Sequence, residues 1–147
     1  MSQENVEIVR GAYEALNRVL RSGAPRDVDA WLEAFHADVE VFDMPMFPDA
    51  QVRRGHDDMR RWIETMLDVF SPGGRWEPEQ VTAAGDFVLV SVRGHGSGRG
   101  SAAPVEARFF QVFEMRDRKI QRIWSDPDEE QALKAAGLSE QDAHADS

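Results

Sequence analysis

Ionisable side chains at the ends of expected strands are the first candidates for chemistry in this sequence. Asp43 ends an apolar stretch, directly before a proline-rich segment. Arg93 and His95 lie two residues apart. Trp124 and Asp126 have the same spacing, so each pair shares one face of a strand. A carboxyl group in an apolar pocket has a raised pKa, and histidine titrates near neutral pH, so both can move protons. We therefore predict Asp43, His95 and Asp126 as catalytic residues.

Each candidate also has a purely structural interpretation. Asp43 could cap the turn that follows it, as aspartate often does. Arg93 and His95 could form a solvated strand end beside a glycine-rich loop. Asp126 precedes a proline and further acidic residues, which is good chemistry for the start of a helix.

The remaining candidates would contact a ligand. Arg93 could hold a carboxylate or an enolate, and Tyr13 could donate a hydrogen bond or simply belong to the core. Met44 and Phe47 could form an apolar lid or pack as a plain loop. The predicted ligand-binding residues are Tyr13, Met44, Phe47, Trp62, Arg93 and Trp124.

The spacing of apolar residues predicts which elements position these side chains. Intervals of three and four indicate helices, and alternation indicates strands. The expected helices are 4–20, a short one from Asp27, 57–70 and 128–136, with Ser2 and Asp27 as N-caps and Gly137 after the last. The expected strands are 39–43, 76–83, 87–95, 105–115 and 119–126. This order predicts an α+β fold in which a curved antiparallel sheet wraps around the N-terminal helices, with a short C-terminal helix. Such a sheet encloses a conical space, where we expect a pocket.

Composition limits the class of protein. With 147 residues and 41% hydrophobic content, we expect one domain over 1–147, ordered over about 4–138 with a frayed tail at 139–147. Seventeen Lys and Arg against 27 Asp and Glu give a net charge of −10, which argues against nucleic-acid and anionic-membrane partners. The sequence has no cysteine, which excludes disulfides and thiolate metal sites and fits a cytoplasmic location. We expect neither a signal peptide nor a membrane span.

No motif indicates a metal or a cofactor. The pair His36 and Asp38, and the run His56, Asp57 and Asp58, lack a third ligand at a meaningful spacing. The glycine-rich segment 94–100 lies between two strands and lacks the Gly-Lys-Ser/Thr of a phosphate-binding loop, so we expect a mobile hairpin loop there.

Four segments, 9–17, 31–41, 54–56 and 132–138, together resemble the SnoaL-like or NTF2-like superfamily. The resemblance implies the cone-shaped fold over nearly the whole chain. It leaves the activity open, because this fold serves isomerases, cyclases, epoxide hydrolases, dehydratases and pure binding modules.

The resemblance also suggests roles residue by residue. The general base of ketosteroid isomerases falls on Asp43, but their tyrosine position holds Ala12, with Tyr13 one residue away. Their acid position falls near Phe110 or Gln111, so we do not predict steroid isomerisation.

Epoxide-hydrolase-like members use an Arg-x-Asp, where this chain has Arg93-Gly94-His95, and an aspartate after tryptophan, where it has Trp124-Ser125-Asp126. Polyketide cyclases use a histidine and an aspartate, which His95 and Asp126 could mimic.

We therefore expect a cofactor-free acid–base enzyme of isomerase, cyclase or hydrolase type that acts on a hydrophobic, oxygenated small molecule. The alternative is a non-catalytic ligand-binding or dimerisation module of the same fold. We also expect a homodimer through the outer sheet face. The alternating residues Phe109, Gln111, Phe113 and Met115 could pack against the helices or pair with another subunit.

Overall fold

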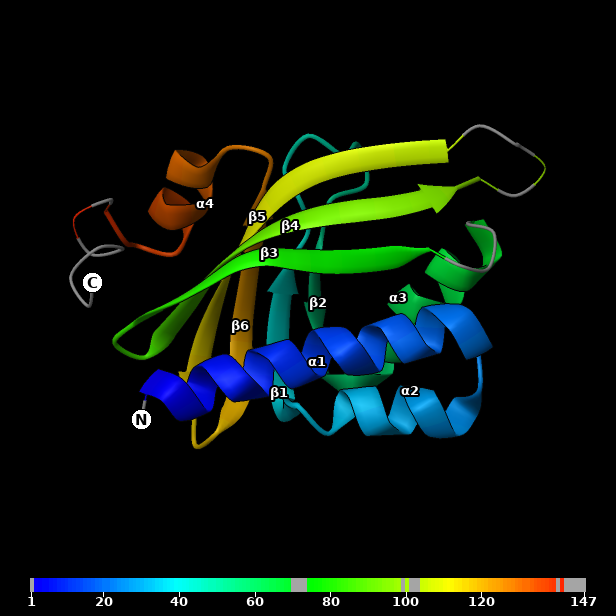
Figure 1. The fold of residues 1–147 in the computed structure, drawn as a ribbon, viewed down its shortest axis with the longest axis horizontal. Coiled ribbons are helices and arrows are strands. Elements are labelled where there is room, and N and C mark those ends of the chain that lie inside the picture. Colours follow the sequence, from blue (N-terminus) through cyan, green and yellow to red (C-terminus); the bar gives the residue numbers. More distant parts are fainter. Residues whose placement is uncertain (1, 70–73, 99, 101–103, 140, 142–147) are drawn as a thin grey trace.

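The computed structural model describes residues 2–69, 74–98, 100, 104–139 and 141, which form helices and one six-stranded sheet (Figure 1). The helices are α1 (Ser2–Ser22), α2 (Pro25–Leu32), α3 (Gly55–Val69) and α4 (Glu129–Ala135). The strands are β1 (Phe35–Phe42), β2 (Val52–Arg54), β3 (Arg75–Ala84), β4 (Phe87–Ser97), β5 (Pro104–Arg116) and β6 (Lys119–Asp126). No helix among these residues is long and apolar enough to span a membrane.

The helices begin and end close to the expected residues. α1 already includes Ser2, and it ends before Gly23, whose φ of +64° favours glycine. α2 begins two residues earlier than predicted, because Pro25 occupies the first turn after Ala24. Asp27 is therefore not its N-cap; it lies in the first turn and accepts a hydrogen bond from the Ser22 hydroxyl at 2.5 Å.

The sheet has the strand order β2-β1-β6-β5-β4-β3. Neighbouring strands are antiparallel except β1 and β6, which are parallel. β2 has only three residues and was not expected. Short turns between consecutive strands predict which strands are antiparallel neighbours. They do not predict the parallel pairing of β1 with β6, because these strands are far apart in the sequence.

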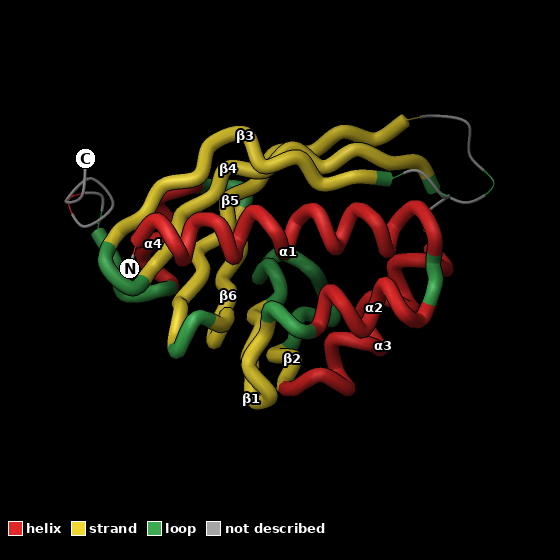
Figure 2. Tube along the Cα trace, turned by 60° about the horizontal axis from the view of Figure 1, so that its bottom comes forward, coloured by secondary structure: helices red, strands yellow, loops and turns green. Residues whose placement is uncertain are grey.

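Opposite faces of the sheet pack against different helices, as Figure 2 shows. On β4, Val88, Val90 and Val92 are buried in the main core, together with residues of α1, α2 and α3. On the other face, Val112 of β5 forms a smaller core with Ala132 and Leu133 of α4. The α+β class, the curved sheet around the N-terminal helices and the short C-terminal helix are thus confirmed.

The face of β5 that carries Phe109, Gln111, Phe113 and Met115 is buried, and three of these residues belong to the main core. These residues therefore pack toward the helices, which leaves the opposite, convex face for any contact with another subunit.

Some predictions concern residues outside the described part. In the tail 139–147, only Ser139 and Gln141 are described. Within the glycine-rich segment, β4 continues through Ser97, while 99 and 101–103 lie outside the described residues, as do 70–73 after α3.

Candidate functional site

A small cavity of about 60 Å³ lies between the helices and the concave face of the sheet; we call it the inner chamber. Its walls come from α1, α2 and α3 and from five of the six strands, and they are mostly apolar. The lining residues are Ala12, Tyr13, Leu16, Trp31, Phe35, Val41, Arg53, Met59, Trp62, Trp76, Gln111, Phe113 and Ile123. Tyr13, Arg53 and Gln111 supply its polar groups.

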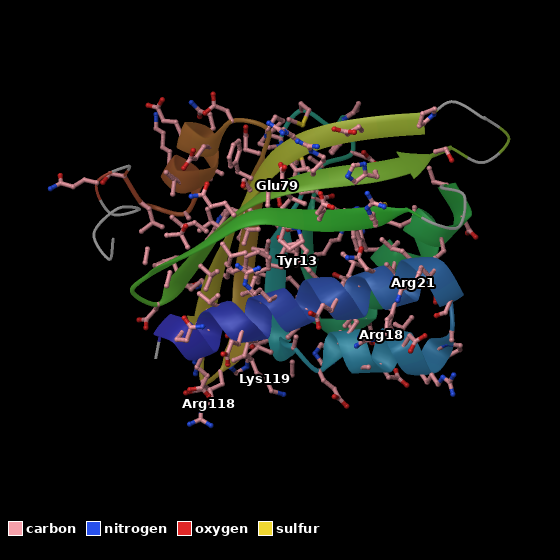
Figure 3. The ribbon with its side chains drawn as sticks, viewed as in Figure 1. Tyr13, Arg18, Arg21, Glu79, Arg118 and Lys119 are labelled. Atoms are coloured by element: carbon pink, nitrogen blue, oxygen red, sulfur yellow. The ribbon has the colours of Figure 1, made fainter. Side chains whose placement is uncertain are left out.

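Tyr13 extends from α1 toward the sheet (Figure 3), where its hydroxyl donates a hydrogen bond to Oε1 of Gln111. Nε2 of Gln111 in turn donates to the Ser125 hydroxyl at 3.0 Å, so a hydrogen-bonded chain connects α1, β5 and β6. Burial raises the pKa of the Tyr13 phenol well above its usual value, because the phenolate would lose its hydration. The hydroxyl is therefore neutral at physiological pH.

Asp43 does not line the chamber itself but is paired with Arg53, which does. Arg53 Nε is 3.1 Å from Oδ1 of Asp43, and a terminal nitrogen of Arg53 is 3.2 Å from Oδ2. Both side chains are largely buried, with 16% of Asp43 and 20% of Arg53 exposed. The backbone N–H of Gln51 also donates to Oδ2, at 3.3 Å. Two parallel contacts from a guanidinium fix the position of the carboxylate.

Aromatic rings form much of the remaining wall. Trp62 of α3 stacks on Trp31, with ring centroids 5.9 Å apart, and meets Trp76 edge-on at 5.7 Å. Trp76 meets Phe109 edge-on at 5.1 Å, and Tyr13 meets Phe113 at 5.8 Å. Such walls suit a flat apolar ligand.

A wider cleft of about 450 Å³ opens beyond the chamber; we call it the outer cleft. It lies at the ends of α1 and α3, under the long arms of β3, β4 and β5 on the right of Figure 1. Its lining residues include Leu20, Arg21, Met66, Trp76, Gly94, His95, Ala107 and Phe109. Arg21 projects near the end of α1 in Figure 3. The cleft has the volume of a typical small-molecule site.

Arg93 does not line either space. The even-numbered residues of β4 face the core, so Arg93 lies on the convex face, where it pairs with Glu79 at 3.1 Å and Glu106 at 3.4 Å. His95 borders the outer cleft, but its Nδ1 lies 3.6 Å from Glu106. Its Nε2 is buried without a hydrogen-bond partner among the described residues.

Trp124 and Asp126 also lie on the convex face: Ile123, which precedes Trp124, belongs to the main core, whereas Trp124 packs against the smaller core beside α4, and Asp126 is two residues further along the same strand. Trp124 stacks on Phe42 at 5.4 Å. Oδ1 of Asp126 accepts a hydrogen bond from the backbone N–H of Asp128, the N-cap of α4. The contact of Asp126 in the structure is therefore the one expected of a residue at the start of a helix.

Some of the predicted ligand-binding residues line the inner chamber and others lie outside both spaces. Tyr13 and Trp62 line the inner chamber, whereas Met44 packs against the main core from the loop after β1. Phe47 is 52% exposed and does not line either space. Asp43, His95 and Asp126 each have a different neighbour: Asp43 pairs with Arg53, His95 lies near Glu106, and Asp126 accepts a hydrogen bond from the N–H of Asp128.

Of the residues that line the chamber, the sequence predicted only Tyr13 and Trp62 as site residues; Arg53, Gln111 and Trp76 are among those it did not indicate. Arg53 lies on β2, whose three residues are too few to show alternation, so its inward direction had no signal. Gln111 carries no ionisable group. Within the described part of the chain, no cluster of three or more His, Asp or Glu side chains could hold a metal ion.

A curved sheet that closes over N-terminal helices and an aromatic cavity defines the NTF2-like class of folds. The chain belongs to the SnoaL-like domain family, whose pattern matches residues 9–123. No curated protein matches the chain.

Solved structures with this fold include an NTF2-like protein of unknown function from Burkholderia pseudomallei K96243. It is 20% identical over 91% of this chain and 97% of its own, with a TM-score of 0.71. A candidate SnoaL-like polyketide cyclase from Jannaschia sp. CCS1 is 20% identical over 85% of each chain, with a TM-score of 0.68. SalBIII, an epoxide hydrolase/cyclase-like enzyme of pyran ring formation in salinomycin, is 21% identical over 84% of this chain and 90% of its own, with a TM-score of 0.68. At these identities the likeness shows the fold alone.

Proposed function

We propose that the protein binds a hydrophobic, oxygen-bearing small molecule in its conical space and that Asp43 transfers a proton to and from it. The observation that carries the proposal is the pair of Asp43 with Arg53, because the guanidinium also lines the inner chamber. It can orient the carboxylate next to a residue of the apolar cavity, and a general base needs such a fixed position. The cyclase-like names of two structural relatives support an oxygenated organic substrate.

The proposed step is proton abstraction next to a carbonyl group. A carboxylate oxygen of Asp43 takes the proton, the C–H electron pair forms the enolate double bond, and the carbonyl electrons move to oxygen. The neutral hydroxyl of Tyr13 exchanges its hydrogen bond to Gln111 for one to that oxygen, which stabilises the developing charge. Protonated Asp43 then returns the proton to carbon. His95 and Asp126 take no part in this step.

The step can be tested without knowledge of the natural substrate. In D₂O, the wild-type chain should catalyse exchange of the acidic α-protons of 2-tetralone, an aromatic ketone, as followed by NMR. Asp43→Asn should lower the rate about a hundredfold, the usual contribution of a general base. Asp126→Asn on the convex face is the matched control and should leave the rate unchanged. Equal exchange rates in wild type and Asp43→Asn would overturn the assignment.

The second candidate is a binding module without catalysis. It is favoured by the contacts of Asp43, since Arg53 and the Gln51 N–H already engage both carboxylate oxygens. In that case tryptophan fluorescence should report 2-tetralone binding, while no variant and no wild-type sample exchanges α-protons. If 2-tetralone binds and its α-protons exchange faster in wild type than in Asp43→Asn, the protein is an enzyme and not a binding module.

We also propose a homodimer through the convex face of the sheet. The N-terminal helices cover the concave face, so the part of the convex side of β4, β5 and β6 that α4 does not cover is the sheet surface left for a partner. Light scattering at micromolar concentration should give twice the chain mass of 16.6 kDa. A mass equal to one chain contradicts the dimer.

A further inference from the structure

Trp76 is the residue that the inner chamber and the outer cleft have in common. Every other lining residue belongs to one space or the other. The indole of Trp76 meets Trp62 on the chamber side at 5.7 Å and Phe109 on the cleft side at 5.1 Å. Among the described residues, Trp76 alone therefore lines both spaces, and it lies between them.

The backbone of Trp76 is fixed from α1. The side-chain amide of Asn17 donates to the Trp76 carbonyl at 2.9 Å and accepts from its N–H at 2.8 Å. Because β3 is an edge strand, these two hydrogen bonds replace the missing neighbour strand at this residue. Across the sheet, Trp76 pairs with Gly94, which has no side chain to restrict the indole. The position of the ring is thus set by Asn17, Trp62 and Phe109.

The two spaces differ in what they can hold. A water molecule takes about 30 Å³ of liquid volume, so the inner chamber of about 60 Å³ has room for only a few heavy atoms. The outer cleft of about 450 Å³ falls in the range of organic-ligand sites. The polar groups of Tyr13 and Arg53, however, lie in the small chamber. A ligand bound in the outer cleft must extend past Trp76 to reach them.

We propose that Trp76 is a specificity-determining residue that limits by size what enters the inner chamber. The apolar body of the ligand stays in the outer cleft, and only a small terminal group, such as a carbonyl with its neighbouring carbon, passes the indole. This inference rests on the proposed function for the identity of the ligand, but the separation of the two spaces is a property of the chain itself. Removal of the indole joins them into one cavity.

Quenching of tryptophan fluorescence measures this separation directly. In a Trp124→Phe background, Trp76→Ala and Trp76→Phe retain the same two tryptophans, Trp31 and Trp62, both in the inner chamber. Acrylamide serves as the small quencher and the bulky nitroxide TEMPOL as the large one. The ratio of TEMPOL to acrylamide quenching constants should rise several-fold in the Ala variant relative to the Phe variant. Local unfolding would raise both constants and leave the ratio unchanged, which would overturn the proposal.

Ligand selectivity provides the second readout, from fluorescence titrations with cyclohexanone and 2-acetylnaphthalene. Trp76→Ala should shift the affinity ratio about tenfold toward the larger ketone, whereas Trp76→Phe should stay close to wild type. An unchanged affinity ratio in the Ala variant, together with Asp43-dependent exchange in wild type, overturns the size limit and leaves the proposed function standing. A change in the quenching ratio without binding of either ketone shows the reverse: the separation by Trp76 holds and the proposed function fails.

Discussion

Tyr13 shows how one side chain can combine a structural and a chemical role. Its hydroxyl is buried, neutral and hydrogen-bonded to Gln111, in a wall that is otherwise aromatic and aliphatic. Buried polar groups without a partner are costly, so the Tyr13–Gln111–Ser125 chain also stabilises the fold.

Tyr13→Phe should therefore destabilise the protein. The variant leaves Oε1 of Gln111 without its donor, which should lower the free energy of unfolding by about 1–2 kcal/mol. Urea denaturation measures the change. The double variant Tyr13→Phe/Gln111→Leu removes both partners and should recover part of the loss. If the single variant unfolds at the wild-type urea concentration, the hydrogen bond does not contribute to stability.

For single residues, the sequence identifies the type of side chain but not the face of the sheet on which that side chain lies. Asp43 could be placed at the end of β1 because an apolar stretch stops at a proline-rich segment. The position of its partner Arg53 could not be predicted from the sequence, since the length and register of β2 depend on its pairing with β1. The direction of Arg93 and Asp126 required the register of β4 and β6 against the core, which the mixed residues at their ends do not specify.

Among the elements, β3 depends on α1 as well as on β4. Asn17 satisfies the outward N–H and carbonyl of Trp76, and no strand lies on that side. The amide is half-buried, so water does not fully replace it.

Asn17→Ala should lower the free energy of unfolding by about 1–3 kcal/mol, because two backbone groups lose their partner. The loss should be local as well: hydrogen exchange of the Trp76 amide should become faster than that of neighbouring β3 amides. Arg18→Ala, one residue on and exposed, is the matched control and should behave as wild type. Unchanged exchange at Trp76 in the Asn17 variant would contradict the role of the amide.

The turn between β5 and β6 is strained. Asp117 and Arg118 have φ values of +51° and +64°, a left-handed conformation that two-residue hairpin turns require and that Asn-Gly adopts at low cost. Arg118 extends toward the start of α1 and pairs with Glu4 at 3.0 Å (Figure 3).

The double substitution Asp117→Asn/Arg118→Gly should stabilise the protein by about 1 kcal/mol, since relief of the left-handed strain exceeds the loss of two exposed ion pairs, Arg118 with Glu4 and Asp117 with Arg116. A rise in Tm measures the gain. Arg118→Ala keeps the strain and loses the pair, so its Tm should fall slightly. A fall in the Tm of the double variant would show that the contact with Glu4 matters more than the backbone.

Most elements were predictable because their signals are local. Period-two alternation located β3 to β6, and intervals of three and four located α1 and α3, each to within a few residues. The three residues of β2 fell below the length at which alternation can be seen. The early start of α2 follows from Pro25, a residue type that is favoured in the first turn of a helix.

Across the whole molecule, the convex face carries a row of ion pairs over four strands. Glu40 of β1 contacts Arg54 of β2 at 3.1 Å and Arg122 of β6 at 2.9 Å, and Arg122 reaches Glu114 of β5 at 2.8 Å. Hydrogen bonds from Arg122 and Arg54 lower the pKa of the Glu40 carboxyl below its ordinary value. The row thus favours the ionised form of Glu40.

This row should make stability depend on pH in the acid range. The unfolded chain protonates Glu40 near its ordinary pKa of 4.5 and the folded chain only at lower pH. The unfolded state therefore binds more protons in this window, so stability is complete above it and is lost as the pH falls through the folded-state pKa. Glu40→Gln should show a smaller fall in Tm between about pH 5 and pH 3 than wild type.

Glu64→Gln, at an exposed position of α3, is the control for a carboxyl outside the row and should retain the wild-type pH slope. Salt should reduce the difference between Glu40→Gln and wild type, because the pairs are partly exposed. An equal slope for Glu40→Gln and wild type would show that the row has no net effect.

The parallel pairing of β1 with β6 also affects how the chain is made. As the ribosome releases the nascent chain, α1, α2 and β1 emerge long before the strand that will hold β1 in the sheet. Phe35, which is buried in the finished protein and pairs with Ile120 of β6, remains without that partner until translation has passed β6. Because this strand pairing forms late, folding is slow and apolar surface stays exposed to solvent during synthesis. We therefore expect the N-terminal third to need chaperone protection more than any other part of the chain.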